Sequence, residues 1–406
     1  MRILMVTEDL PAPQVGGLGK HVVTLANHLI RCGHEVDILG RSDRDYASVR
    51  DEVGFNGRFI EGFPMGRNGW KETQLGVFMP PKRPALARRI AQSVIAHSAG
   101  YQVIHYHGHL PMLGRYLPAS LPFVQTRHDQ GSECVTHVRF KEGGVCSATD
   151  ARACAQCIHP SPGPLRTMIS AHAVRRYRKE VAETFALRPT IFVSDFLRRN
   201  FVRAVPGADM KNARVIHNFI DLERLRQIVD PDVRVRPRTL LIAGRVDEAK
   251  GFGAFLRALM PSLPEDVTVD VLGDGPEREG LQRDFASESV RFSGWQPYEE
   301  VIRRTRTSHV CVVPSVLEES CGTTVLEALC LGRPCVALAR GGTPELCAFE
   351  RYSGQLALAG SMNELVTLSL NAIAQAPLDL PMPKEFGADV NEIATCITNC
   401  YEEIVA

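Results

Sequence analysis

Short apolar runs alternate with amphipathic stretches along the whole chain, and this alternation predicts an α/β protein. Residues 2–8 are expected to form a buried strand, residues 21–34 a helix that ends at a glycine, and residues 35–41 the next strand. Such units imply a parallel sheet covered by helices on both faces. Further strands of the first half are predicted at 103–107, 122–128, 190–195 and 213–218.

The same pattern starts again after the polar segment DPDVRVRPR at 230–238. A helix is expected at 251–263, and strands are expected at 239–245, 267–276, 290–295, 309–315 and 334–340. Two successive α/β blocks predict two doubly wound, Rossmann-like domains that face each other across a cleft. Ligands of such folds bind beyond the carboxyl ends of the strands, which here means in that cleft.

The predicted domain boundaries follow from these blocks. An N-terminal domain is expected at 1–214 and a C-terminal domain at 215–387. The last segment, 388–406, has the pattern of an amphipathic helix and is expected to pack back on the first domain. A cysteine-rich stretch at about 130–163 reads as an insertion in the first domain.

Composition excludes several classes of function. The 406 residues are 44% hydrophobic, enough to bury a core in each domain, and 47 Lys and Arg balance 46 Asp and Glu. This balance gives no electrostatic reason to expect a nucleic-acid partner. No apolar run approaches the roughly 18 residues of a membrane span, and the N-terminus does not have the pattern of a signal peptide. A cytoplasmic protein is therefore expected, with its twelve cysteines as thiols or metal ligands.

One basic stretch could bind a membrane surface. Residues 173–181 (AVRRYRKEV), together with Arg198 and Arg199, form a cationic zone in the first domain. It could meet anionic lipid head groups at the inner face of the membrane, or it could be an ordinary solvated helix face.

Two carboxylates stand out in the segment 314–334, PSVLEESCGTTVLEALCLGRP. Glu319 and Glu327 are separated by seven residues, and Glu327 lies within an apolar helical run. Carboxylates are uncommon in such a run unless a positive or hydroxyl-rich group meets them. The segment is therefore expected to border a polar ligand site where a loop enters a helix.

Two further segments have the chemistry of a phosphate site. The loop PQVGGLGKHV contains Gly16 and Gly17 at the predicted start of a helix, although its GGxG spacing is a poor match to a dinucleotide fingerprint. GRVDEAKG contains Arg245 and Lys250 just beyond a predicted strand, where two cations can hold a diphosphate. An ordinary strand–helix turn and a solvated charge pair are the alternatives.

The ordered set of these motifs resembles the retaining glycosyltransferases of family 4, which have the two-domain GT-B fold. The resemblance spans nearly the whole chain and includes the Glu319–Glu327 pair with its fixed gap. It rests on GGLG, VIHNFIDLERL, GRVDEAKG, VLGDGPEREGL, the GW at Trp295, LEESCGTTVLEALCLGRPCVA and GGTPEL.

The resemblance implies a nucleotide-sugar donor, UDP- or GDP-linked, and an acceptor hydroxyl on a glycan, a lipid-linked glycan or a small natural product. It also implies that the domain 1–214 binds the acceptor and the domain 215–387 binds the donor. Arg245 and Lys250 match the pair that binds the donor diphosphate, and Gly16 and Gly17 match a loop that approaches that diphosphate and the acceptor. Glu327 matches the carboxylate that binds the ribose. The remaining matches are Glu319 near the donor sugar, the N–H groups of Gly322, Thr323 and Thr324 near sugar or phosphate, and His128 near the transferred sugar.

The implied mechanism is front-face attack with retention and without a dedicated protein nucleophile. His128, Arg245, Lys250 and Glu319 are the expected catalytic residues, and the cations are expected to replace the divalent metal that many other transferases use. The chain departs from the family at Ser320 and Cys321, where members often have proline and phenylalanine, and at Phe219, where they often have glycine. These changes bear on the shape of the donor pocket.

The cysteine-rich insertion predicts a structural zinc ion. Cys134, Cys146, Cys154 and Cys157 lie within one stretch, and the last two form a C-x2-C pair suited to tetrahedral zinc. His137 or His159 could replace one cysteine, an iron–sulfur cluster could use the same thiolates, and unliganded thiols are a further alternative. A second polar feature, the alternating His105, His107 and His109, is expected to present one face, as a polar cluster or as metal ligands.

Two rival functions remain beside the transferase. A nucleotide-sugar epimerase could use the same two-domain fold, and an inactive nucleotide-sugar-binding protein could retain it. The presence of Arg245, Lys250 and Glu327 favours the transferase over both. The pattern does not indicate the oligomeric state.

Overall fold

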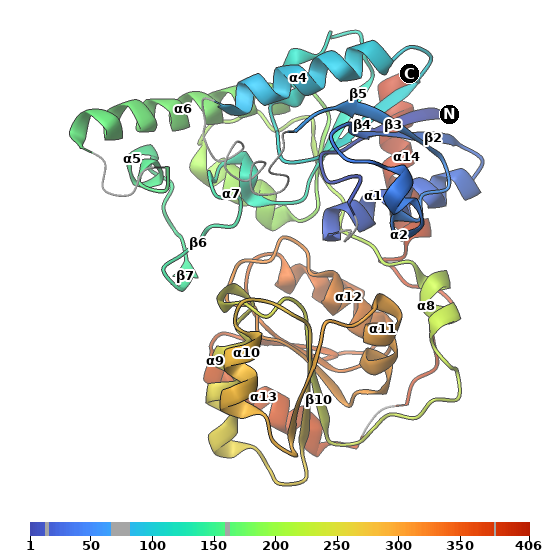
Figure 1. Ribbon diagram of the computed structural model, residues 1–406, viewed down its shortest axis with the longest axis vertical. Coiled ribbons are helices and arrows are strands. Elements are labelled where there is room, and N and C mark those ends of the chain that lie inside the picture. The colour runs from blue at the N-terminus through green and yellow to red at the C-terminus, as the bar shows by residue number, and fades with distance from the viewer. Residues whose placement is uncertain (13–15, 66–81, 159–162, 377–378) are drawn as a thin grey trace. The chain divides into compact units, whose positions relative to one another are not determined.

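The computed structural model describes residues 1–12, 16–65, 82–158, 163–376 and 379–406 (Figure 1). The chain forms two compact units. The first comprises Met1–Arg139, Ser147–His217 and Val390–Ala406, and the second comprises Phe140–Cys146 and Asn218–Asp389. The division after His217 lies three residues beyond the predicted boundary at 214, and the segment 140–146 of the insertion is grouped with the second unit.

The first unit contains a seven-stranded, entirely parallel sheet. Its order is β3-β2-β1-β4-β5-β8-β9, so the direction of progress along the sheet reverses between β1 and β4. Loops that leave neighbouring strands at such a reversal diverge and open a crevice. The strands are β1 (Arg2–Val6), β2 (Glu35–Arg41), β3 (Arg58–Phe63), β4 (Val103–His107), β5 (Phe123–Arg127), β8 (Thr190–Phe192) and β9 (Ala213–Val215).

The helices of the first unit cover this sheet. α1 (Gly17–Arg31) buries Val22, Leu25, Ala26 and Leu29 on one face, and the chain leaves it through Gly33 at a φ of +86°. The C-terminal helix α14 (Val390–Val405) packs against α1 and β4 within this unit. The other helices are α2 (Arg50–Val53), α4 (Lys82–His97), α5 (Ala151–Ala155), α6 (Pro164–Leu187) and α7 (Asp195–Ala204).

The insertion contains a short hairpin that the sequence pattern did not predict. β6 (Phe140–Lys141) and β7 (Gly144–Val145) pair antiparallel across Glu142 and Gly143. Both turn residues have positive φ, +54° and +74°, which is the two-residue turn that matches the twist of a hairpin.

The second unit has a six-stranded parallel sheet of order β12-β11-β10-β13-β14-β15, which reverses between β10 and β13. Its strands are β10 (Thr239–Ala243), β11 (Thr268–Leu272), β12 (Val290–Gly294), β13 (Val310–Val313), β14 (Cys335–Leu338) and β15 (Leu356–Ala359). Its helices are α8 (Leu222–Ile228), α9 (Phe252–Leu259), α10 (Arg278–Phe285), α11 (Tyr298–Thr307), α12 (Thr323–Cys330) and α13 (Met362–Ala374).

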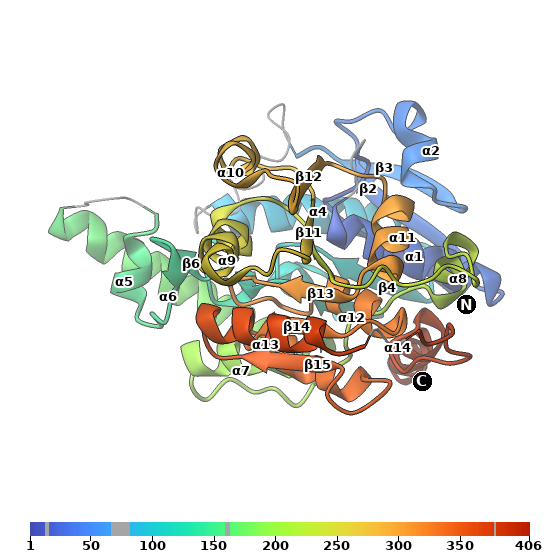
Figure 2. The ribbon, with the colours of Figure 1, turned by 90° about the horizontal axis from the view of Figure 1, so that it is seen from below.

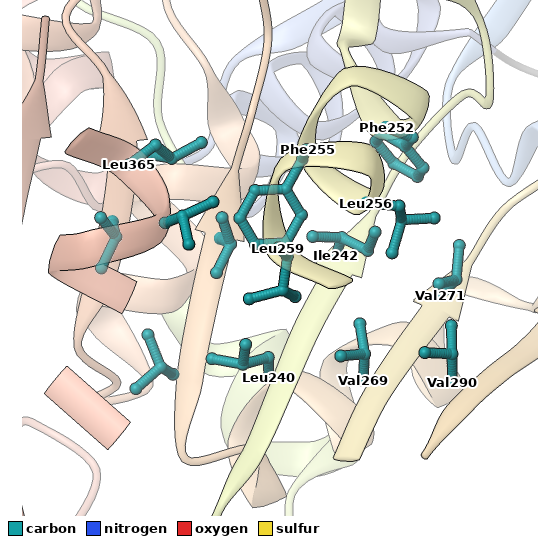
Figure 3. Packing of buried hydrophobic residues seen from close by; sticks show 14 of the residues in the cluster. Leu240, Ile242, Phe252, Phe255, Leu256, Leu259, Val269, Val271, Val290 and Leu365 are labelled. Carbon is teal, nitrogen blue, oxygen red and sulfur yellow. The ribbon is translucent and has the colours of Figure 1, made fainter. Parts of the chain in front are cut away.

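The core of this unit lies between the sheet and α9 and α13. Leu240 and Ile242, two residues apart on β10, face the same layer as Phe255 and Leu259 of α9 (Figure 3). Figure 2 shows α13 lying across β14 and β15, which it contacts. This packing fixes the carboxyl ends of β10 and β13, from which the candidate site is built. In the described part of the chain, no helix combines the length and apolar character needed to cross a membrane.

Candidate active site

A cavity of about 180 Å³ opens in the second unit at the carboxyl ends of β10 and β13 and the start of α12. The reversal of the sheet lies between these two strands, which is where open α/β sheets bind ligands. Six of the predicted site residues line this cavity: Arg245, Lys250, Glu319, Gly322, Thr323 and Thr324.

Lys250 and Glu319 form the polar centre of this cavity. Lys250 Nζ lies 2.5 Å from Glu319 Oε1, and the Ser315 hydroxyl donates to the same oxygen at 2.7 Å. Both charged groups are partly exposed to solvent. The cation and the carboxylate therefore hold each other at the cavity while remaining accessible to a ligand.

The loop that presents Arg245 and Lys250 is fixed by its own capping. Asp247 Oδ1 accepts a hydrogen bond from the Lys250 backbone N–H at 3.0 Å, and its Oδ2 lies 3.1 Å from Arg245 Nε. The loop ends at Gly251, whose φ is +73° and where a Cβ would lie 2.2 Å from the Pro314 carbonyl oxygen. Only glycine lets the loop pass this close to the end of β13.

The backbone at Glu319 is held from the segment that follows β14. The Gly342 N–H donates to the Glu319 carbonyl oxygen at 2.7 Å. Gly341 has a φ of +60°, and a Cβ there would lie 2.2 Å from the same oxygen. The GGTPEL motif therefore has a physical role, because its first glycine permits the close approach that positions Glu319.

The N-terminus of α12 faces the cavity through Gly322, Thr323 and Thr324. Its first turn contains no acidic residue, and the first N–H groups of a helix have no partner within the helix. The positive end of the helix is therefore suited to an anion. Cys321, one of the positions where the sequence departs from the expected motif, is buried, and burial raises the pKa of its thiol to about 12.

Glu327 lies further along α12, outside the lining of this cavity. The Tyr298 hydroxyl, from the first residue of α11, donates to Glu327 Oε1 at 3.0 Å. Burial and the neighbouring Glu327 raise the pKa of Tyr298, so that the phenol keeps its proton. Arg224 lies over the Tyr298 ring, 4.9 Å from its centre. Tyr298 was not predicted as a site residue, because the only local signal for it is its position shortly after the GW segment.

His128 lies in the first unit, just after β5. Its Nε2 is 3.0 Å from Nδ1 of His107, the last residue of β4, and its ring packs edge-on to His21 of α1 at 4.6 Å between centres. Burial, followed by the neighbours His21 and Arg127, lowers the pKa of His128 well below its usual value. His128 is thus a neutral imidazole held by His107. The contacts with His21 and His107 were not predicted from the sequence.

Gly16 and Gly17 also belong to the first unit. Gly16 is the N-cap of α1, and no side chain caps this helix end. A Cβ at either glycine would meet no described atom within 4 Å. The backbone at the start of α1 is therefore open to approach among the described residues.

The three alternating histidines do not share one environment. His105 bonds Tyr401 of α14 and Thr126 of β5, at 2.6 and 2.7 Å, and His107 bonds His128. His109 lies beyond the end of β4, where it bridges Asp9 and Asp129 at 3.1 and 2.7 Å. Burial alone would lower the pKa of His109, but these two carboxylates raise it well above its usual value.

Two groups of described residues bring three metal-ligating atoms within 4.8 Å of one another. In one of them, His109, Asp129 and His137, Arg83 donates to His137 Nε2 at 2.9 Å and leaves the proton on Nδ1, facing Asp129. That nitrogen cannot then ligate a cation. In the other, His21, His107 and His128, the last two hydrogen bond to each other.

Neither group contains a cysteine, so the predicted zinc site is not visible among the described residues. Cys134 Sγ contacts the Thr136 hydroxyl at 3.2 Å, and Cys154 Sγ accepts from Arg178 Nη2 at 3.2 Å. His159, a possible replacement ligand, lies outside the described residues. The zinc ion remains a prediction.

Comparison with known families accounts for both units. Residues 15–224 match the family model described as Glycosyltransferase Family 4, which is more than half of the chain. The chain belongs to glycosyltransferase family 4. Residues 237–373 of this glycosyltransferase match a second model, described as Glycosyl transferases group 1.

Individual relatives of this glycosyltransferase are distant but cover most of its length. It is 26% identical over 369 residues to a D-inositol 3-phosphate glycosyltransferase of Corynebacterium diphtheriae, which covers 85% of this chain and 80% of the relative. The same identity and coverage hold for a glycogen synthase of Mycobacterium tuberculosis.

Solved structures show the fold of this glycosyltransferase. HepE of Anabaena, in complex with UDP and glucose, has 17% identity and a TM-score of 0.60, with 98% of this chain and 99% of that chain covered. Sucrose-phosphate synthase of Thermosynechococcus elongatus has 18% identity and a TM-score of 0.64, with 100% and 99% covered. The two parallel α/β units therefore have the GT-B fold that the sequence predicted.

Proposed function

We propose that this glycosyltransferase moves a sugar from a UDP- or GDP-linked donor to an acceptor hydroxyl, with retention at the anomeric carbon. The observation that carries the proposal is the single cavity in which Lys250, Glu319, Arg245 and the N-terminus of α12 come together. Two cations and a helix N-terminus suit a diphosphate, and an adjacent carboxylate suits sugar hydroxyls. The UDP complexes of the structural relative HepE support a nucleotide donor.

Donor binding is proposed to exchange the partners of Lys250 and Glu319. Without donor, each charge neutralises the other at 2.5 Å. A diphosphate carries more negative charge than one carboxylate, so Lys250 turns to the phosphate oxygens. Glu319 is then released to accept hydrogen bonds from the sugar. Movement of the Lys250 side chain would therefore prepare both the phosphate contact and the sugar contact.

Glu327 is proposed to hold the nucleotide ribose. Tyr298 donates to Oε1 of this carboxylate. A carboxylate oxygen has more than one acceptor position, and Oε2 offers further ones. Glu327 can therefore accept ribose hydroxyls while Tyr298 fixes its orientation. Base selection is expected to depend on the backbone near Trp295, directly after β12.

The proposed chemistry is front-face attack, in which the leaving phosphate helps to take the acceptor proton. Within the cavity, burial holds the Cys321 thiol in its protonated form, so it is not prepared as a nucleophile. Glu319 would be occupied by hydrogen bonds from the sugar hydroxyls once the donor is bound. Arg245, Lys250 and the α12 dipole would stabilise the charge that grows on the diphosphate, without a catalytic metal.

The proposed roles of the first-unit residues rest on the family resemblance. Neutral His128, with one ring nitrogen engaged by His107, would position the sugar or the attacking hydroxyl through its other nitrogen. Gly16 and Gly17 would approach the donor through the open backbone at the start of α1. The acceptor is proposed to be a glycan, a lipid-linked glycan or a small natural product.

Release of nucleoside diphosphate from UDP- and GDP-sugars, in the presence of an acceptor panel, tests this function. The proposal expects acceptor-dependent release from one donor series, and the anomeric proton of the product should show the same configuration as the donor by NMR. Epimerisation of the donor without an acceptor would assign the chain to a different activity. Inversion at the anomeric carbon would overturn the front-face mechanism alone.

We also propose that the insertion binds a structural zinc ion through Cys134, Cys146, Cys154 and Cys157. The support is the C-x2-C pair, together with the Arg178 guanidinium that donates to Cys154 Sγ. A donor of this kind stabilises a thiolate, the form that binds zinc. Elemental analysis should find about one zinc per chain and less in Cys157→Ser. Stoichiometric iron would indicate a cluster instead, and a stable metal-free protein would remove the claim.

A further inference from the structure

Three large apolar side chains are exposed on the first turns of α6. Leu165, Met168 and Ile169 are 68%, 60% and 61% exposed. Their spacing of three and four residues places them on one face of the helix. In Figures 1 and 2 these turns form the outer end of the first unit, beside α5. Exposed apolar side chains scattered singly are normal, but a group on one helix face marks a binding surface.

The same face of α6 continues as a basic stripe. His172, Arg176 and Lys179 follow at helical spacing from Leu165 and Ile169, and the side chains of Arg176 and Lys179 are 70% and 78% exposed. Exposed Arg166 and Arg175 flank them. We define this surface, Leu165–Ile169 with the cations from Arg166 to Lys179, as the α6 face.

Acidic groups offset only part of this positive charge. Arg176 lies 3.1 Å from Glu180, whose side chain is mostly buried, and Lys179 lies 3.9 Å from Glu183. Glu183 also pairs with Arg115 of the segment Leu113–Tyr116. Exposed ion pairs of this kind are weak, so the cations can exchange these partners for external anions. The α6 face remains cationic overall.

The opposite face of α6 anchors the helix in the first unit. Val174 packs in a buried cluster with Val135, Ala151 and Ala155, and Tyr177, Val181 and Phe185 are also buried. The apolar residues of the α6 face therefore cannot rotate into this core. They are presented to the outside on a fixed helix.

We propose that the α6 face docks this enzyme on an anionic lipid bilayer. Leu165, Met168 and Ile169 would enter the boundary between head groups and acyl chains, while the cations meet lipid phosphates. Charge favours a bilayer over a second copy of the chain, because the α6 face of a second copy offers this cationic stripe further cations and few anions. This proposal does not depend on the proposed transfer reaction, and binding to lipid can be measured without a sugar donor or acceptor.

Co-sedimentation with lipid vesicles tests the proposal on the intact protein. Vesicles of phosphatidylcholine and phosphatidylglycerol in equal parts should bind at least about tenfold more protein than phosphatidylcholine alone, and added salt should weaken binding. The triple variant Leu165→Ser, Met168→Ser, Ile169→Ser should lose about tenfold in binding. Ile95→Ser, which changes an exposed apolar residue of α4, is the matched control and should bind as the unaltered protein does.

Three results would overturn the proposal. The first is that the protein binds anionic and neutral vesicles equally. The second is that the triple variant binds as the unaltered protein does, and the third is that Ile95→Ser loses as much binding as the triple variant. Light scattering of the same proteins adds a fourth, because a dimer that the triple variant abolishes would assign the α6 face to self-association. Circular dichroism of the triple variant should match the unaltered protein, since all three side chains are exposed. Arg176→Glu with Lys179→Glu provides an independent variant and should lower binding to anionic vesicles only.

Discussion

Lys250 Nζ lies 2.5 Å from Glu319 Oε1, although the two residues are 69 positions apart in the chain. One comes from the loop after β10 and the other from the loop after β13, at the point where the sheet of the second unit reverses. The pair joins the proposed phosphate ligand to the proposed sugar ligand. In the proposed complex, loss of either residue would therefore affect both ends of the donor.

Lys250→Ala should reduce transfer by at least about a hundredfold, because it removes a cation that stabilises the leaving diphosphate. The fold should persist, since the side chain is partly exposed and contributes one exposed pair. Steady-state release of nucleoside diphosphate measures the effect. Arg257→Ala, an exposed cation of α9, is the control and should act as the unaltered enzyme does. Near-normal turnover by Lys250→Ala would show that the catalytic site is elsewhere.

Tyr298→Phe should raise the donor KM about five- to tenfold with little change in kcat, because it deletes one hydrogen bond that orients Glu327. The variant should also discriminate less between a donor and its 2′-deoxyribose analogue. Comparing the two donors in both enzymes distinguishes an error about Glu327 from an error about Tyr298. Equal use of both donors by the unaltered enzyme would contradict ribose binding by Glu327, whereas unchanged discrimination in Tyr298→Phe would contradict only the role of the tyrosine.

Gly341→Ala should both destabilise the protein and lower its activity. The added Cβ would lie 2.2 Å from the Glu319 carbonyl oxygen, at a φ of +60° that alanine rarely adopts. We expect a loss of about 1–3 kcal/mol in the free energy of unfolding, measured by urea denaturation. Gly280→Ala in α10 is the control, where the nearest described atom is 3.8 Å away and alanine favours the helix. Equal stability of the two variants would refute the steric argument.

Much of the candidate site in the second unit could be predicted from the sequence because its residues lie close to strand ends. Lys250 follows β10, and Glu319 and Thr323 follow β13, so parallel-strand geometry alone brings them to one edge. The loop glycines were likewise visible as motifs. The direct bond between Lys250 and Glu319 could not be predicted from residue spacing. It depends on the conformations of two separate loops, which tertiary contacts determine.

Other features depend on tertiary contacts that a local pattern does not contain. The edge strands β3 and β15 were not predicted, because RFIEGF carries a glutamate and a glycine and LALA is only four residues long. Tyr298 meets Glu327 from a helix 29 residues away. His21, His107 and His128 come from three separate elements, so their cluster follows only from the strand order β1-β4-β5 and the position of α1.

Acid should destabilise the first unit through its buried His105. Burial lowers the pKa of His105 from 6.5 to about 3, so below pH 6.5 the unfolded chain binds a proton that the folded chain does not. The free energy of unfolding should therefore decrease as the pH is lowered from about 6.5 to about 3. His105→Gln should make this fall shallower by about 1.4 kcal/mol per pH unit, measured by denaturant titration across pH. An unchanged slope would mean that His105 titrates normally in the folded protein.

Binding of nucleoside diphosphates tests the central claim most directly, because it requires neither the sugar nor the acceptor. Calorimetric titration of UDP and of GDP into the intact enzyme should show one site for one of them. Lys250→Ala and Glu327→Ala should each weaken that binding by at least about tenfold. Glu279→Ala, an exposed acid of α10, should leave it unchanged. Failure of the unaltered enzyme to bind either diphosphate, or binding that both variants retain, would contradict the account.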